Sequence, residues 1–224
     1  MISVIVSIYD EETILAGNTH KFCALGEHAE LIFVDGGSSD KSAEIASRCG
    51  RTFCSPKGRA LQMNHGARGA GGDTLLFLHA DTTILPQTLN SIETQIRKNG
   101  FVGGCLTQRI DSKKIIYRFI ESHGNIRARI KKIFYGDQGI FVTKEAFLKA
   151  GGFPAVPIME DVLFTKKLRK LGKVTVLPDE ILVSSRRWDK GGILKTILIH
   201  NLIVALFCFK FPLQKIKKLY GDVR

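Results

Sequence analysis

Short apolar runs alternate with longer, mostly polar stretches along most of the chain. The apolar runs have the length of strands, and several lack charged residues, as is typical of strands buried on both faces. They cover Ile2–Ile8, Glu30–Val34, Arg51–Cys54, Leu75–Leu78, Phe101–Ile110, Ile140–Val142, Val174–Leu177 and Ile181–Val183.

The stretches between these runs carry the start and stop signals of helices, which are Ser, Thr or Pro at the beginning and Gly at the end. The predicted helices cover Lys41–Cys49, Pro86–Asn99, Lys113–Phe134 with a break at Gly124, the residues from a cap at Thr143 to Lys149, and Met159–Leu171. This alternation predicts an α/β fold, in which a mixed, largely parallel sheet is flanked by helices.

Carboxylates follow three of the predicted strands at the point where each strand ends. Asp81 follows Leu75–Leu78, Asp35 follows the second strand, and Asp10 and Glu11 follow the first. In an open α/β sheet, ligands bind outside the carboxyl ends of the strands. A carboxylate there can hold Mg²⁺ or Mn²⁺, which prefer oxygen ligands and bridge phosphates. The sequence therefore predicts a ligand site at this edge, with Asp81 as the metal ligand.

A purely structural explanation stays open for these acids. Asp81 can cap the helix that begins near Pro86, and Glu11 can favour the positive end of a helix that follows the first strand. The first strand is not followed by the glycine-rich turn of a dinucleotide-binding fold, which argues against an NAD or FAD site.

Arginines at glycine-rich or strand-end positions are the candidates for phosphate binding. Arg59 follows Gly58 at an expected helix N-terminus, where free N–H groups and the helix dipole attract phosphate. Arg186 and Arg187 precede Trp188, and two guanidinium groups beside an indole suit a phosphate and a sugar face.

Two acids, Glu160 and Asp161, open the predicted helix that ends at Leu171. Acids are common in a first helical turn because the helix dipole favours them. A carboxylate there can also act as a general base if it reaches an acceptor hydroxyl.

Charge and cysteine content narrow the class of protein. The formal net charge of +12 over 224 residues predicts anionic partners, such as phosphate groups, nucleic acid or an anionic lipid surface. The five cysteines lack metal-ligand spacing, so we expect them to be reduced and mostly buried, as in a cytoplasmic protein. The first residues lack the positive region of a signal peptide, which favours a strand there.

The most apolar segment near the C-terminus is Ile193–Phe211, and lysines follow it. Its uninterrupted part, Leu202–Phe209, is too short to span a bilayer. We expect a helical arm over residues 191–224 that covers the domain, forms a dimer or contacts a membrane surface. A packed core helix with basic flanks explains the pattern equally well.

Several motifs occur in an order that resembles family 2 glycosyltransferases with the GT-A fold. They are Ser3–Val6 with Asp10–Glu12, Val34–Asp40, Phe77–Asp81, Gly151–Phe153 and Glu160–Asp161. The chain is also similar to a bacterial subgroup of small members, through Pro56–Ala60, Gln62–Asn64, Gly136–Gly139 and Ser185–Trp188. The resemblance spans about residues 2–188. It implies a GT-A domain over residues 1–190, followed by the arm over 191–224.

The resemblance implies an inverting transfer of a sugar from a nucleoside diphosphate sugar to an acceptor hydroxyl. Asp10 or Glu11, together with Asp35, would contact the base and the ribose. The family's metal-binding DxD pair maps onto Asp81 and Thr83, so that one carboxylate remains. Asp81 would then hold Mg²⁺ or Mn²⁺ with phosphate oxygens and water. The diphosphate would meet Arg59, Arg186 and Arg187.

The same resemblance assigns the remaining roles. The family's base lies in the pair that maps onto Glu160 and Asp161, and we expect Asp161 to be the base. Asp137, Gln138 and Trp188 are expected on the acceptor side. Ser184 occupies the glutamine position of the Gln-x-x-Arg-Trp motif of processive members, so we do not expect a processive polymerase.

Two other functions stay open from the sequence. A nucleotidyltransferase that makes nucleotide sugars would need a glycine- and arginine-rich loop where Tyr9–Glu12 stands. In a non-catalytic basic module that binds a membrane or nucleic acid, the carboxylates at the strand ends would have no role. We expect the transferase, in the cytoplasm or at the inner face of the cell membrane if its acceptor is lipid-linked, without a nucleic-acid partner.

Overall fold

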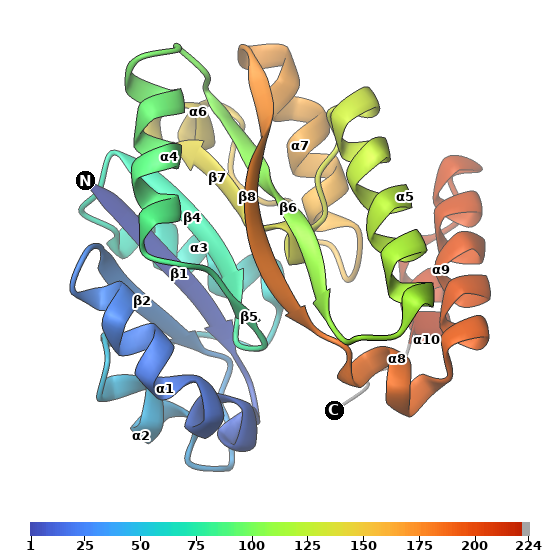
Figure 1. Ribbon diagram of the computed structural model, residues 1–224, viewed down its shortest axis with the longest axis horizontal. Coiled ribbons are helices and arrows are strands. Elements are labelled where there is room, and N and C mark those ends of the chain that lie inside the picture. The colour runs from blue at the N-terminus through green and yellow to red at the C-terminus, as the bar shows by residue number, and fades with distance from the viewer. Residues whose placement is uncertain (221–224) are drawn as a thin grey trace.

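The computed structural model describes residues 1–220, apart from the side chain of Arg187. An eight-stranded sheet runs through the molecule in the order β3-β2-β1-β4-β7-β6-β8-β5 (Figure 1). Its strands are β1 (Ile2–Ile8), β2 (Glu30–Asp35), β3 (Arg51–Cys54), β4 (Thr74–His79), β5 (Thr82–Thr83), β6 (Gly103–Asp111), β7 (Ile140–Thr143) and β8 (Val174–Ser184).

The first four strands form a parallel half-sheet with β1 at its centre. β1 pairs with β2 on one side and with β4 on the other, and β2 pairs with β3, all in parallel. The register sets Ile8 opposite Asp35 and Ser7 opposite His79, so these strands end at one edge of the sheet. The predicted alignment of the strand ends is therefore confirmed.

The second half of the sheet is mixed. β7 is antiparallel to both β4 and β6, whereas β8 is parallel to β6. The two short strands predicted after residue 173 are one strand, β8, so that prediction is wrong. The ladder shifts register between the pairs of Cys105 and Thr107, and Pro178 falls in this gap, where its missing N–H is not needed.

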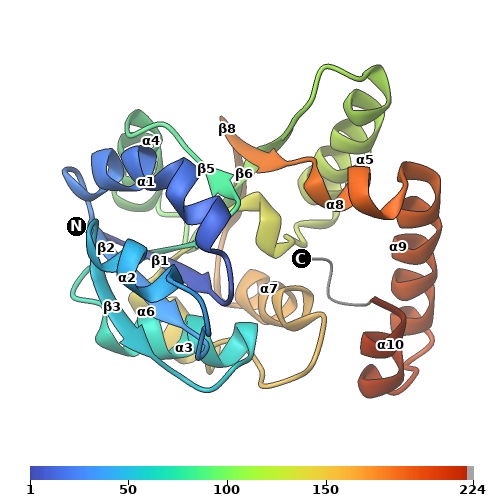
Figure 2. The ribbon, with the colours of Figure 1, turned by 90° about the horizontal axis from the view of Figure 1, so that it is seen from below.

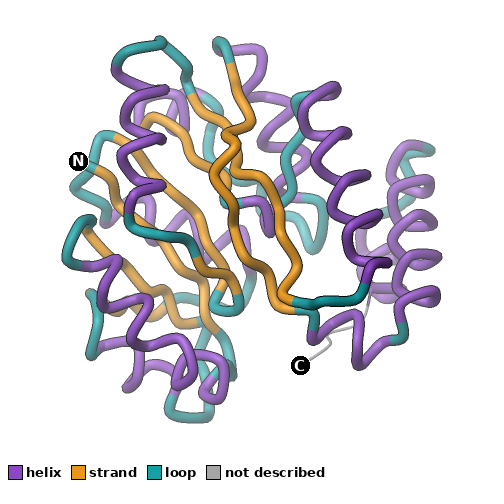
Figure 3. The backbone as a smooth tube through the Cα atoms, in the orientation of Figure 1, coloured by secondary structure: helices purple, strands orange, loops and turns teal. Residues whose placement is uncertain are grey.

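Helices cover both faces of the sheet (Figures 1 and 3). Successive side chains of a strand point to opposite faces, so β1 contributes Val4 and Val6 to one core and Ile5 to the other. The first core includes residues of α1 (Glu12–Gly26), α2 (Ser42–Ser47) and α4 (Gln87–Arg97). The second includes residues of α3 (Arg59–Gly69), α5 (Ile115–Lys131), α6 (Lys144–Lys149) and α7 (Glu160–Leu171).

Helix α5 is unbroken, which corrects the predicted break at Gly124. Its inner face is anchored by hydrogen bonds to the neighbouring strand β6. The Asn125 side chain accepts from the N–H of Gln108 at 2.9 Å and donates to its carbonyl at 3.0 Å. The buried Glu121 accepts from the N–H of Ile110. Contacts on both sides of Gly124 outweigh the low helix propensity of glycine.

The cysteines differ from the expectation of reduced, mostly buried thiols. Cys23 in α1 and Cys49 after α2 form a disulfide, with their Cα atoms 4.6 Å apart. Both helices lie over the same face of the sheet, which brings the two side chains together. Cys54 and Cys208 are exposed, and Cys105 is the buried one among these three free cysteines.

The helical arm predicted for residues 191–224 contains α9 (Ile193–Cys208) and α10 (Leu213–Tyr220), and α8 (Arg186–Gly191) connects it to the sheet. Its residues 221–224 lie outside the described part of the chain. Figure 2 shows α9 and α10 along the rim of the molecule that lies away from β1–β3. Ile203 and Ile216 are buried against Met159 and Val162, so one side of the arm packs on the start of α7. Within residues 1–220, no helix combines the length and the apolar character needed to cross a membrane. The boundary at residue 190 stays a prediction.

Replacement of Gly66 by alanine is expected to destabilise the fold. Gly66 lies where α3 packs on the sheet, and an added Cβ would lie 2.5 Å from Ile5 Cγ2 and 3.0 Å from Val34 Cγ2. Such overpacking costs about 1–3 kcal/mol, more than the roughly 1 kcal/mol that alanine gains over glycine in a helix. Urea denaturation should give a lower midpoint for Gly66→Ala.

The matched control is Gly17→Ala in α1, where the added Cβ would have no heavy atom within 4 Å other than its chain neighbours and the backbone of its own helix. This variant should gain up to about 1 kcal/mol of stability. Equal gains in both variants would contradict the packing of α3 described above.

Candidate active site

The carboxyl ends of β1 and β2 are tied together by one side chain of α3. The Gln62 amide donates to the carbonyl of Ile8 at 2.7 Å and to that of Val34 at 2.9 Å. Ile8 also accepts from the N–H of Gly36 at 3.0 Å. Gln62 is buried, so its hydrogen bonds replace those that water would make to these two carbonyl groups.

Asp35 and Asp10 shape the loop that follows β2. The buried Asp35 accepts from the N–H groups of Gly37 and Ser38 at 3.0 and 2.9 Å. Asp10, which has a positive φ of 49°, accepts from the N–H of Ser39 at 2.8 Å. This hydrogen bond is the largest cause that lowers the pKa of Asp10. Both carboxylates are thus brought to one loop, as the strand-end pattern predicts.

Glu11 and Arg186 meet across a sequence separation of 175 residues. Arg186 Nη2 lies 3.1 Å from Glu11 Oε2, and both side chains are more than two-thirds buried. Arg186 begins α8, so this ion pair joins the end of β1 to the segment after β8.

Asp81 lies in the turn between β4 and β5. Thr82 closes this turn, because its hydroxyl accepts from the N–H of His79 and donates to the carbonyl of the same residue. The Asp81 carbonyl accepts from the N–H of Ser184 at 3.2 Å. The first residue flanking α4 is Pro86, and no side chain caps that helix, so the capping role considered for Asp81 is not present.

Asp81 lines a small depression of about 120 Å³. Thr83, Asp111 and Ser184 also line it, with Ile14, Asn18 and Lys21 of α1. Burial raises the pKa of Asp81, and the charge of Asp137 adds to the rise, whereas Arg186 and Arg59 oppose it. A carboxylate in such surroundings gains from a further positive charge.

Glu160 and Asp161 open α7 and face Arg59 from α3. Arg59 Nη1 lies 3.5 Å from Glu160 Oε1, and Glu160 is buried. Asp161 Oδ2 accepts from the N–H of Gly136 at 2.7 Å. Burial, and next the charge of Glu160, raise the pKa of Asp161 to about 7, although the Gly136 hydrogen bond and Arg59 act against this rise. A carboxyl group with this pKa can accept a proton near neutral pH.

The turn that supplies the Gly136 N–H packs against His79. An added Cβ on Gly136 would lie 2.8 Å from His79 Nε2, so only glycine leaves room for the ring. Burial, and next the charge of Arg59, lower the pKa of His79 to about 3, so the ring is neutral. His79 Nε2 is buried, and it has no hydrogen-bond partner among the described residues.

Asp137 and Gln138 follow in the same short 3-10 helix, η1 (Gly136–Gln138). Asp137 Oδ2 accepts from the Gln108 side chain at 2.6 Å, while its Oδ1 is buried and lacks a partner within residues 1–220. Gln138 is fully buried, and its carbonyl oxygen accepts from Arg127 and from the N–H of Tyr135. Gln138 therefore stabilises the turn, and Asp137 lies near the carboxyl edge of the sheet.

Trp188 lies in α8 with its ring 6.4 Å from the ring of Tyr117, in an edge-to-face arrangement. The Tyr117 hydroxyl donates to Asp189 at 3.0 Å, and Lys114 pairs with the same carboxylate at 3.0 Å. These contacts join α8 to the start of α5. The side chain of Arg187 lies outside the described residues.

The side chains at the carboxyl edge of the sheet fit a divalent cation that takes most of its ligands from a bound molecule and from water. In residues 1–220, no three His, Cys, Asp or Glu side chains are grouped as metal ligands. Asp81 is the carboxylate in the depression whose burial favours a positive partner. An ion held there would need further oxygens from a phosphorylated ligand and water, which suits Mg²⁺ or Mn²⁺.

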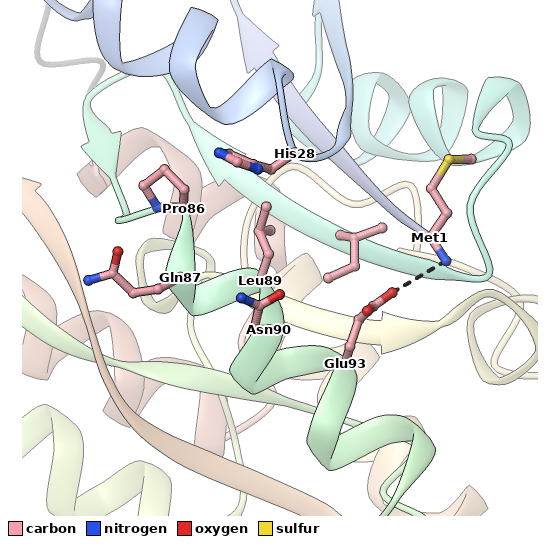
Figure 4. A pocket seen from close by; sticks show the side chains of 8 residues that line it. Met1, His28, Pro86, Gln87, Leu89, Asn90 and Glu93 are labelled. Carbon is pink, nitrogen blue, oxygen red and sulfur yellow. Dashed lines mark ion pairs between the residues drawn. The ribbon is translucent and has the colours of Figure 1, made fainter.

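A second, larger pocket of about 390 Å³ lies at the other end of β1 (Figure 4). It is lined by Met1, His28, Gln87 and Glu93, among others, and the N-terminal amine lies 3.4 Å from Glu93 Oε1. It holds none of the residues predicted for the site. Parallel α/β sheets bind ligands at the opposite edge, so we do not take this pocket as the active site.

A family model described as glycosyl transferase family 2 matches residues 3–151 of the chain. The chain belongs to glycosyltransferase family 2. The match covers more than half of the sequence and includes the carboxylates that end β1, β2 and β4. No curated protein matches the chain.

Solved structures confirm the predicted GT-A fold of this glycosyltransferase. TarS from S. aureus in complex with UDP-GlcNAc aligns with a TM-score of 0.66 and 18% identity, over 83% of this chain and 58% of that chain. The mannosyltransferase PcManGT from Pyrobaculum calidifontis, in complex with GDP-Man and Mn²⁺, aligns with a TM-score of 0.63 and 18% identity, over 81% and 56%. The chain thus spans a little over half the length of either structure, and at this identity the likeness concerns the fold.

Family membership favours a transferase over the nucleotidyltransferase and over the non-catalytic basic module. Several side chains that organise the candidate site were not assigned a role from sequence. Gln62, Gln108 and Arg127 are polar residues within elements, and their partners are distant in sequence. His79 carried a signal, because it follows four apolar residues of β4 and precedes Asp81 by two positions.

Replacement of Asp161 by asparagine is expected to flatten the pH dependence of stability. The folded protein keeps a proton on Asp161 up to about pH 7, whereas the unfolded chain releases it near its ordinary value of 3.8. Wild-type stability should therefore fall as pH rises through this window. From about pH 4 to about pH 8, Asp161→Asn should gain up to about 4 kcal/mol relative to wild type.

Urea denaturation at several pH values measures this difference. The control is Asp73→Asn, because the Asp73 side chain is 88% exposed. Wild type and Asp73→Asn should give parallel profiles. A parallel profile for Asp161→Asn as well would contradict the raised pKa.

Proposed function

We propose that the chain transfers a sugar, with inversion, from a nucleoside diphosphate sugar to an acceptor hydroxyl. The observation that carries this proposal is the Asp161 carboxylate, which has a pKa of about 7 and a fixed hydrogen bond to the Gly136 N–H. It stands at the edge of the sheet where Asp81 also lies. An inverting transfer needs a base for the acceptor and positive charge for the donor diphosphate, and a divalent cation held by Asp81 would supply such charge.

The nucleotide is assigned to the ends of β1 and β2. Asp35 and Asp10 already fix the loop that follows β2, so this loop presents a preformed surface to a base and a ribose. Glu11 completes this side through its pair with Arg186. TarS and PcManGT were solved with UDP-GlcNAc and GDP-Man, which supports a nucleotide sugar as donor without selecting one.

The diphosphate is assigned to the space between Asp81, Arg59 and Arg186. A divalent ion held by Asp81 would stabilise negative charge on the leaving diphosphate. Arg59 and Arg186 reach this region from α3 and α8, and both influence the pKa of Asp81. We extend the same role to Arg187, the next residue along α8. PcManGT was solved with Mn²⁺, which supports the metal.

In the proposed reaction, the acceptor oxygen attacks the anomeric carbon from the face opposite the diphosphate. The bond from that carbon to the acceptor oxygen forms while its bond to the phosphate oxygen breaks, and the hydroxyl proton passes to Asp161. Glu160 keeps Arg59 beside this base through their ion pair. The Gly136 N–H orients the carboxylate that receives the proton.

The acceptor side is assigned to Asp137 and Trp188, with Gln138 as the buried support of the turn. Asp137 Oδ1 and His79 Nε2 are buried and have no partner in the described part of the chain, which leaves a hydrogen bond from each open to water or to a bound substrate. A lipid-linked acceptor and a location in the cytoplasm, at the inner face of the membrane, stay predictions.

Nucleotide binding should depend on Asp81. Thermal shifts are measured with UDP, GDP, TDP and their sugars, with and without Mg²⁺ or Mn²⁺. A site filled well above its Kd stabilises the fold by roughly 2–4 kcal/mol. One nucleotide should raise the Tm of wild type in the presence of metal, and Asp81→Asn should lose most of this shift.

Asp73→Asn is the control, since Asp73 directly precedes the same strand at its other end. It should behave as wild type. If no nucleotide shifts the Tm of wild type at saturating concentration, the transferase proposal is wrong.

Asp161→Asn should lose catalysis and keep donor binding. Without the base, the acceptor proton has no recipient, and kcat should fall by about 10²–10⁴-fold. The measurement is nucleoside diphosphate release from the donor identified by thermal shift, with the thermal shift itself as the binding control.

Glu145→Gln is the matched variant, because Glu145 is likewise an acid in the first turn of a helix, α6, and is exposed. It should release nucleoside diphosphate at the wild-type rate. An Asp161→Asn protein with wild-type kcat would assign the base elsewhere.

A further inference from the structure

Exposed apolar side chains gather on one part of the molecule. Among the described residues, ten of the fifteen large hydrophobic side chains with high exposure belong to residues 115–130 and 194–219. These residues lie on α5, α9 and α10 or at the end of α9. Helices α5 and α9 are neighbours in both Figure 1 and Figure 2. A surface of this kind marks a site of interaction.

On α5, the exposed apolar side chains form a single stripe, which consists of Ile115, Phe119, Ile126 and Ile130. Their spacings of four, seven and four residues keep them on one side of a helix. The buried side chains Tyr117, Glu121, Asn125 and Ala128 occupy the other side, toward β6. The α5 stripe therefore points away from the sheet.

On α9, a second stripe consists of Leu194, Leu198 and Leu202, spaced by four residues. The opposite side of α9 packs on the domain through Ile203, with Ile199 and Phe207 partly buried beside it. Phe209, which follows α9, is 82% exposed. One side of α9 therefore packs on the domain, and a second apolar side is exposed.

The surroundings of both stripes are strongly basic. Residues 191–220 contain no Asp or Glu, and they contain Lys195, Lys210, Lys215, Lys217 and Lys218. Within α5, the one acid is Glu121, which is buried and pairs with Arg118 at 2.9 Å. Exposed Lys113, Lys114, Arg129 and Lys131 flank the α5 stripe. Apolar side chains with cationic neighbours suit an anionic bilayer. The lipid headgroups attract the cations, and the interface of the bilayer takes up the apolar side chains.

We propose that the α5 stripe and the α9 stripe together dock the protein on an anionic lipid bilayer. The stripes lie on the outside of helices that are otherwise packed, so binding needs no unfolding. The proposed contact is peripheral, because each stripe lies on a helix whose other side packs on the domain. The surface does not overlap the donor site, so it adds a partner to the proposed transferase and does not depend on it.

Docking would bring the active-site edge close to the lipid. Lys114 at the start of α5 pairs with Asp189 of α8, and α8 also carries Arg186, which pairs with Glu11 at the end of β1. The docked surface and the donor site are therefore connected through one short helix. An acceptor hydroxyl presented at the membrane surface would have a short path to Asp161 if the proposed function holds.

The experiment is vesicle co-sedimentation with the full chain. The vesicles contain phosphatidylcholine alone or phosphatidylcholine with phosphatidylglycerol. Wild type should bind the anionic vesicles more tightly, and added salt should weaken binding. Two variants, Phe119→Ser with Ile130→Ser and Leu194→Ser with Leu198→Ser, should each lower the partition coefficient by about tenfold or more.

The matched control is Leu85→Ser with Leu148→Ser, which changes two exposed leucines outside the stripes. It should bind vesicles as wild type does. If the two stripe variants bind anionic vesicles as tightly as the control variant does, the proposal is overturned. A wild-type dimer in size-exclusion chromatography with light scattering that both stripe variants break would also overturn it, because a second copy would then cover the stripes.

The failure of this proposal is distinguishable from that of the proposed function. The stripe variants should keep the nucleotide-dependent thermal shift of wild type, since their residues lie outside the donor site. Loss of vesicle binding together with an unchanged nucleotide shift supports docking. If both stripe variants have a much lower Tm than wild type without nucleotide, the stripes stabilise the fold, and the docking proposal is overturned.

Discussion

β1 is hydrogen-bonded on both sides by parallel strands, and this pairing determines where the carboxylates that follow β1, β2 and β4 lie. Because β2 and β4 run in the same direction as β1, their last residues reach the same edge. A shift of one residue in either pair would turn the side chains of that strand to the other face. The two cores on either side of β1 prevent this, since each takes alternate residues of the strand. The site thus depends on the packing of a strand that contributes none of its own side chains to catalysis.

Several carboxylates at one edge of the sheet repel one another, and arginines from distant parts of the sequence reduce this repulsion. Arg59 reaches Glu160 from α3, and Arg186 reaches Glu11 from α8. Burial, and next the charge of Glu160, raise the pKa of Asp161 although Arg59 opposes the rise, so the charge of this carboxylate is only partly compensated. Partial compensation is useful at a catalytic site, because a fully neutralised carboxylate would be a poor base at neutral pH. Asp81 is in a similar position, with a raised pKa that favours a bound cation.

Much of the fold could be predicted from the sequence because its strands are short, apolar and sharply bounded. The predicted strand Ile2–Ile8 has the bounds of β1, and the alternation with helices follows from the same pattern. The strand ends then located Asp35 and Asp81 at one edge. The parts that failed depend on contacts between distant residues. The disulfide between Cys23 and Cys49 requires two helices over one face, and the continuity of β8 through Pro178 requires the shifted ladder with β6. The hydrogen bond from Gly136 to Asp161 likewise needs a turn placed against His79, which no local pattern encodes.

Gln62 shows how this edge restricts the sequence at two positions together. Its amide needs both hydrogens, one for each strand, so glutamate lacks the donors and asparagine is one methylene too short. The same amide lies 3.2 Å from where a Cβ of Gly36 would stand, and Gly36 donates to the carbonyl of Ile8 that Gln62 also binds. A side chain at position 36 would therefore press on the amide that holds both strand ends. Across related sequences, positions 36 and 62 should therefore vary as a pair, as a covariation signal between the loop after β2 and α3.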